Sequence, residues 1–200
     1  MTEIERLSTE QLEHLERLLA EQGAPIVQRL QPPASAEAFA VIEAEFGLPV
    51  PEELRLWWGW HDGTNVKPHE KAAKASIGPL FEFLSMEEAL KATRESRELA
   101  LDIDPDEPEI YWGKTWLALG TDGRVACDLM SGPGASVSVL DVDYHKTSKP
   151  GTIAAQSLGE MVRWWIEALE SGAWRYEPEH NRWARREELV PPEREQVGLV

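Results

Sequence analysis

The sequence has little of the chemistry that most catalytic and metal sites require. Cys127 is the one cysteine among 200 residues, so an intramolecular disulfide and a cysteine-based zinc cluster are both excluded. It lies in the apolar run RVACDLM, which favours a buried thiol over a nucleophile. The five histidines show neither HxxxH nor HxH spacing, and the chain contains no GxSxG motif. We therefore expect no catalytic residues, no metal ion and no cofactor.

Long apolar runs are missing as well. No stretch approaches the ~20 apolar residues that a membrane-spanning helix needs, and the acidic start MTEIERLSTEQ has no secretory signal. We expect a cytoplasmic protein that does not insert into membranes. A chain of this length can bury roughly 70% of its extended surface, which favours a single domain with a sizeable core.

Basic residues are scarce relative to acidic ones. The chain has 20 Lys and Arg against 36 Asp and Glu, a formal net charge of -16. Residues 1–110 hold 23 acidic and 10 basic residues, a net charge of -13. Such a surface repels phosphate backbones and attracts basic partners, so we expect no direct binding to nucleic acid. The alternative interpretation is that the excess charge only keeps the protein soluble.

Apolar spacing and capping residues predict five helices. Ser8, Ser35 and Ser157 are placed to cap three of them, and Pro51 suits the first turn of another. Ser8 and Gln11 have the spacing of a capping box. We expect helices over residues 9–22, 36–46, 51–61, 86–102 and 158–171.

Three tryptophans occur in four positions of the third predicted helix. Trp57 and Trp58 share a stripe with Leu54, and such a stripe usually belongs to the core. A stacking platform for sugars is the alternative for these two indoles. Trp60 lies off the stripe beside the turn Asp62-Gly63, where an exposed tryptophan would suit a binding surface.

The remaining apolar segments predict strands. Residues 77–84 resemble one strand entered through Gly78-Pro79, and residues 116–130 form a hairpin around Thr121-Asp122-Gly123. Residues 131–135 then turn the chain into a further strand over residues 136–144. We predict an α+β fold with a mainly antiparallel, twisted sheet and packed helices. After Trp174 we expect an extended segment that packs on the body, with a loose end after about Leu189.

The acidic stretch at residues 102–109 invites a calcium interpretation. Asp102, Asp104 and Asp106 occupy positions 1, 3 and 5 of an EF-hand loop. Glu107, however, stands where that loop needs glycine, and Gly113 stands where it needs a bidentate glutamate. We interpret the stretch as a solvated acidic loop.

Taken together, three blocks of sequence resemble the SUKH superfamily of Smi/Knr-type domains. The first block begins with a predicted helix that carries a glutamate and ends in a glycine. A residue followed by proline, an aromatic-rich helix and a final Asp-Gly pair come next. Its residues are Glu43, Gly47, Val50-Pro51, Leu54, Trp57-Trp58 and His61-Asp62-Gly63. The second runs from Trp116 to Gly123 and on to Asp128, and the third is residues 153–158. Val50 and Asp62 depart from the usual leucine and asparagine. The blocks cover roughly residues 35–172.

The resemblance implies a binding function, because the family has no established catalytic residues. Many bacterial members are immunity proteins that neutralise a cognate toxin, often a nuclease. The alternatives are a regulatory interaction module in cell-wall or carbohydrate metabolism and an undetected hydrolase. We expect a domain over residues 1–174 that includes the N-terminal helix, and a partly flexible extension over residues 175–200. The expected partner-binding residues surround the predicted turns: Trp60, Asp62, Asp122, Asp141, Asp143 and Tyr144.

Overall fold

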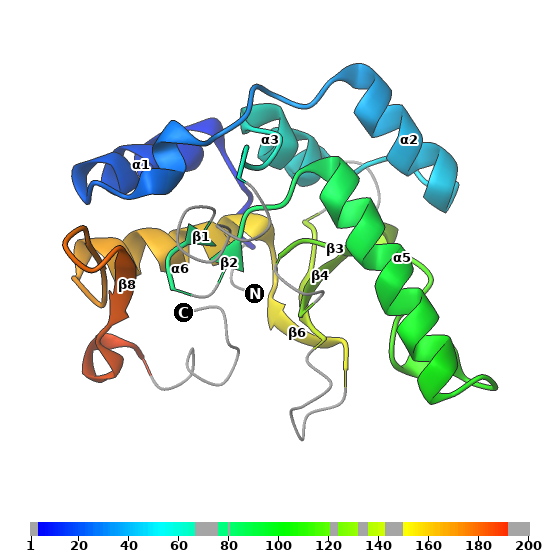
Figure 1. Ribbon diagram of the computed structural model, residues 1–200. Coiled ribbons are helices and arrows are strands. Elements are labelled where there is room, and N and C mark those ends of the chain that lie inside the picture. Colours follow the sequence, from blue (N-terminus) through cyan, green and yellow to red (C-terminus); the bar gives the residue numbers. More distant parts are fainter. Residues whose placement is uncertain are drawn as a thin grey trace.

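The computed structural model describes residues 4–66, 76–79, 81–120, 124–131, 136–142 and 150–191, to which every structural statement below refers (Figure 1). The helices are α1 (Thr9–Glu21), α2 (Ala36–Phe46), α3 (Glu52–Trp60), α5 (Met86–Ile103) and α6 (Leu158–Glu170). Short 3-10 turns are η1 (Pro25–Gln28), η3 (Pro108–Ile110), η5 (Leu129–Ser131) and η6 (Glu187–Leu189). The strands are β1 (Ser76–Ile77), β2 (Phe81–Glu82), β3 (Trp116–Ala118), β4 (Val125–Asp128), β5 (Val139–Asp141), β6 (Thr152–Ala155), β7 (Trp174–Glu177) and β8 (Arg182–Arg185).

Four helices begin where serine caps them, whereas α3 begins at Glu52, so that Pro51 lies at its N-cap position and not in its first turn as expected. The Ser8 hydroxyl accepts from the Gln11 N–H at 3.2 Å, and the Gln11 side-chain oxygen accepts from the Ser8 N–H at 3.0 Å. Ser85 and Glu88 form the same reciprocal box at the start of α5. Each such cap satisfies N–H groups that a helix leaves unpaired and contributes about 1 kcal/mol. Local sequence therefore sets the helix boundaries.

The central sheet has the order β3-β4-β5-β6, and neighbouring strands are antiparallel. This arrangement confirms the α+β class and the predicted hairpin over residues 116–130. Because side chains alternate across a strand, the sheet has two apolar faces. Leu117, Cys127 and Val139 belong to the main core, and Ala118, Ala126 and Leu140 belong to a smaller second cluster that also contains Trp112.

The main core lies between the helices and the first sheet face. α1 and α3 pack on α6, while α2 packs along α5 (Figure 1). Aromatic rings fill the centre: the Trp165 ring lies 6.1 Å from that of Trp57, 4.7 Å from that of Phe81 and 6.5 Å from that of Trp174. All four are at most 2% exposed. Burial of these large rings is the dominant stabilising contribution of the core.

The predicted single strand at residues 77–84 is wrong. The segment forms a small hairpin in which β1 pairs with β2, with Ser76 opposite Glu82. Gly78 has φ +69°, and a Cβ at this position would overlap with the Trp174 ring. The chain therefore reverses at Gly78 because glycine allows both the left-handed backbone and the close approach of the indole.

Two further strand regions also differ from the expectation. The extended segment after residue 173 is a hairpin, β7–β8, in which Tyr176 lies opposite Trp183. Asn181, with φ +48°, supplies the left-handed residue of its turn. β6 was not predicted, because residues 152–155 precede the last predicted helix and show no strand pattern of their own. The expected packing of this segment on the body is confirmed, since Trp174 and Tyr176 are at most 5% exposed and the partly buried Trp183 also packs against the core.

Candidate functional site

Trp57 and Trp58 belong to the core. Both side chains are 0% exposed, and the Trp58 indole N–H donates to the Leu84 carbonyl at 3.0 Å. The Trp57 ring lies 4.7 Å from that of Phe83. The prediction of a core role is confirmed, and neither indole face is open to a sugar.

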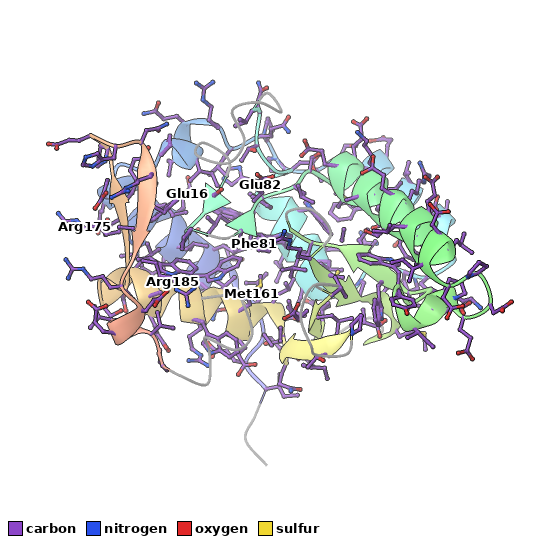
Figure 2. The ribbon with its side chains drawn as sticks, turned by 60° about the horizontal axis from the view of Figure 1, so that its bottom comes forward. Glu16, Phe81, Glu82, Met161, Arg175 and Arg185 are labelled. Carbon is purple, nitrogen blue, oxygen red and sulfur yellow. The ribbon has the colours of Figure 1, made fainter. Side chains whose placement is uncertain are left out.

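Trp60 is half-buried and is held in place on both sides. Its indole N–H donates to the Glu16 carboxylate of α1 at 3.0 Å, and its ring stacks on Phe83 at 5.6 Å. His61 lies edge-on to the same indole and directs its Nε2 towards Glu16 at 3.5 Å. Figure 2 shows Glu16 on α1, on the same part of the molecule as Phe81 and Glu82. Trp60 therefore offers a partner only part of its ring.

Asp62 connects the end of α3 to the start of α5. Its Oδ1 accepts from the Met86 N–H at 2.7 Å, the first N–H of α5. Burial raises the pKa of Asp62, and Glu88 and Glu87 raise it further, although the hydrogen bond from Met86 opposes the shift. Its carboxylate already has a structural role, which sequence spacing alone did not reveal.

The other predicted partner-binding residues do not form a described surface with Trp60 and Asp62. Asp141 is 8% exposed and lies in β5 between Val125 of β4 and Thr152 of β6. An aspartate this buried presents little carboxylate to a partner. Asp122, Asp143 and Tyr144 lie outside the described residues.

Glu53 of α3 is a buried carboxylate that connects distant segments of the chain. It is 3% exposed, and its two oxygens accept from the backbone N–H groups of Leu7 at 2.7 Å, Val137 at 2.6 Å and Gly159 at 3.4 Å. One side chain of α3 thus holds the segment before α1, the segment before β5 and the start of α6. These partners are 46, 84 and 106 residues away in the sequence, so no local pattern could have identified them.

An open pocket of about 470 Å³ lies on the second face of the sheet. Glu107, Glu109 and Ile110 of the η3 segment line one side, residues 150–152 line the other, and Trp116 contributes an indole. Lys114 pairs with Glu109 at 2.7 Å, and this hydrogen bond lowers the pKa of Glu109. Glu109 is therefore ionised at neutral pH. We refer to this feature as the η3 pocket.

Two glycines let the backbone approach the Trp116 indole closely in the η3 pocket. A Cβ at Gly113 would lie 2.6 Å from the ring, and a Cβ at Gly151 would overlap with it. Gly151 also has φ +80°, a conformation that other residues rarely adopt. The Trp112 indole N–H donates to the backbone carbonyl of Trp116 at 3.2 Å. The Trp116 ring is therefore packed directly against the backbone at Gly113 and Gly151.

The two ends of the molecule carry different sets of charged residues. Near the C-terminal end of α5, the exposed acidic residues are Asp102, Asp106, Glu107 and Glu109. The β7–β8 hairpin lies at the opposite end and is mixed in charge, because Arg175 and Arg185 are accompanied by Glu177, which pairs with Arg182 at 2.9 Å (Figures 1 and 2). The hairpin therefore does not form a purely basic surface.

Other site types have little support in the described part of the chain. Burial raises the pKa of the Cys127 thiol, which disfavours the nucleophilic thiolate. Among the described residues, no three His, Cys, Asp or Glu side chains gather as metal ligands would. No helix in these ranges is long and apolar enough to span a membrane.

The fold and its arrangement of sheet and aromatic helices define a SUKH-type α+β domain. The model of the SMI1 / KNR4 family (SUKH-1) matches residues 33–164, which is more than half of the chain. The chain therefore belongs to the SMI1 / KNR4 family. A comparison with curated proteins gave no match. The family match contains α2, α3, the central sheet and the start of α6, and it ends before the β7–β8 hairpin.

Proposed function

We propose that this SUKH protein is a non-catalytic binding protein that acts as an immunity protein, neutralising a basic toxin domain by covering its active site or substrate groove. The observation that carries this proposal is the exposure of its acidic residues. Exposed acidic side chains lie on α1, α2, α3, α5, η3 and the connection between α5 and η3, and they include Glu10, Glu13, Glu21, Glu37, Glu52, Glu95, Glu98, Asp102, Asp106, Glu107 and Glu109.

Charge complementarity supports a basic partner over an acidic one. A nuclease toxin needs a positive surface to grip its phosphate backbone. An immunity protein with the opposite charge is attracted to that surface over a long range, and the association rate increases as salt decreases. Contacts between aromatic and apolar side chains then set the dissociation rate.

The predicted surface around Trp60 and Asp62 stays part of the proposal, together with Asp122, Asp143 and Tyr144. Trp60 can contribute the exposed part of a fixed ring, because Glu16 and Phe83 hold it from the other sides. Asp141 is too buried to contribute directly.

The experiment is affinity capture from the lysate of the source cells at low and at high salt, with mass spectrometry of the bound proteins. A basic, secreted toxin domain that is retained at low salt and released at high salt is the expected result. Recovery of cell-wall enzymes would favour the regulatory function. Recovery of no specific partner at either salt concentration would contradict the binding function.

A further inference from the structure

We propose that the η3 pocket is the docking site for an arginine side chain, presented by a basic and partly apolar segment of the protein partner. This inference rests on the proposed function and adds a second surface that the basic partner contacts, besides the one around Trp60 and Asp62. The pocket lies on η3, β3 and β6, away from the Trp60 and Asp62 surface at the end of α3.

The shape of the pocket suits a side chain. Its volume of about 470 Å³ is within the range of clefts that hold small ligands, roughly 300–1,000 Å³. It is open to solvent, so a side chain from another protein can enter without a movement of the backbone. The site is therefore suited to an inserted residue.

The Trp116 indole provides a surface that is ready to bind a cation. The backbone at Gly113 and Gly151 packs directly against the ring, which limits its movement and reduces the entropy that binding would cost. The face of a tryptophan ring attracts cations more strongly than those of tyrosine and phenylalanine, and arginine stacks on it more often than lysine. The planar guanidinium therefore matches this surface better than an ammonium group does.

Two carboxylates at the edge of the same pocket complete the match. Glu107 is exposed, and its side chain has no hydrogen-bond or ion-pair partner within the described ranges. Glu109 is paired with Lys114, whose side chain is 81% exposed and can be displaced. A guanidinium donates to two carboxylate oxygens at once, whereas a phosphate or an acidic side chain would be repelled by both glutamates.

Exposed apolar side chains at the pocket indicate which residues flank the arginine in the partner segment. Ile110 lines the pocket and is 40% exposed. Ile153 follows Thr152, which lines the opposite side of the pocket, and is 48% exposed. Large apolar residues in such a position are typical of an interaction surface. The segment that fits has an arginine flanked by aliphatic residues.

The test uses a fluorescein-labelled peptide, Gly-Leu-Arg-Leu-Arg-Gly, with both ends capped, and its counterpart with citrulline in place of arginine. Binding to the full chain is measured by fluorescence anisotropy at low and high salt, and the Trp116 indole resonance is followed by NMR. We expect the arginine peptide to bind and to shift this resonance, and the citrulline peptide to bind about tenfold more weakly. Higher salt should weaken the binding of the arginine peptide.

Matched variants locate the site. The double variant Glu107→Gln with Glu109→Gln should weaken binding about tenfold, and Trp116→Leu should weaken it several-fold. Glu13→Gln with Glu21→Gln removes the same charge from exposed positions of α1 and should change affinity less than about twofold. The proposal is wrong if the two double variants weaken binding equally, if the citrulline peptide binds as well, or if no peptide binds at about 2 mM.

The outcome is separable from that of the proposed function, because the peptide test requires no toxin. Arginine docking at the η3 pocket without a toxin in the capture experiment would support this surface and contradict the immunity function. A captured toxin that binds Glu107→Gln with Glu109→Gln as tightly as the wild type would support the immunity function and contradict this surface.

Discussion

At the scale of single residues, Glu53 shows how one buried carboxylate can connect distant segments. Its ionic hydrogen bonds are stronger than those between neutral groups, and leaving a buried N–H unpaired costs about 1–3 kcal/mol. Sequence analysis could place Glu53 in the first turn of a helix but could not predict its burial. That burial depends on residues that approach only after the whole chain has folded.

We predict that Glu53→Gln lowers the free energy of unfolding by about 2–3 kcal/mol. A glutamine keeps one oxygen but directs its NH₂ group towards N–H donors that now lack an acceptor. Urea unfolding followed by circular dichroism measures the change. The neighbouring Glu52→Gln, at an exposed position, should change stability by less than about 0.5 kcal/mol. Equal effects of the two substitutions would contradict the role assigned to Glu53.

Asp62 provides a residue-scale prediction about pH. Burial raises its pKa in the folded protein above the ordinary value of 3.8. The folded state therefore takes up a proton more readily than the unfolded state, and this group makes the protein less stable as the pH rises from about 3.8 through the raised pKa.

Asp62→Asn should remove this pH dependence, because asparagine keeps the oxygen that accepts from Met86 and has no charge. Relative to the wild type, the variant should become more stable as the pH rises through that interval and then show a constant difference. Urea unfolding at several values between about pH 4 and pH 7 tests this. A difference that stays constant over the whole range would show that Asp62 has no raised pKa.

At the scale of elements, the helices were predictable and several strands were not. The starts of α1, α2, α5 and α6 depend on serine caps that are visible in the sequence. The strand β6 has only four residues, TIAA, and its alanines have little intrinsic preference for a strand. It forms because β5 provides a paired edge, which is a tertiary cause. The short β1–β2 hairpin likewise depends on the contact between Gly78 and Trp174.

The β7–β8 hairpin is predicted to belong to the same cooperative unit as the helices, although it lies outside the family match and at the predicted domain boundary at residue 174. Trp174→Ala should lower the free energy of unfolding by about 3–5 kcal/mol, because it leaves a cavity beside Trp165. Thermal and urea unfolding measure the loss. Arg175→Ala, on the exposed face of the same strand, serves as the control and should have little effect. A Trp174→Ala protein with unchanged stability would show that the hairpin is independent of the core.

At the scale of the whole molecule, composition gives the sign of the net charge but not the arrangement of the surface. The charge of -16 was evident from the sequence. The structure adds that Trp60 and Asp62 are already engaged in internal contacts, whereas Glu107, Glu109, Ile110 and Trp116 surround an open pocket. The acidic loop at residues 102–109 was interpreted only as solvated. Its position beside Trp116 could not be predicted, because it depends on how the end of α5 packs on the sheet.

The central claim is that this SUKH protein neutralises a basic toxin by binding it. The most direct test places the basic domain recovered by the capture experiment under inducible expression, with and without the chain. We predict that induction arrests growth and that co-expression of the wild-type chain restores it. Persistent growth arrest, with the chain present as a folded protein in excess of the toxin, would contradict the claim.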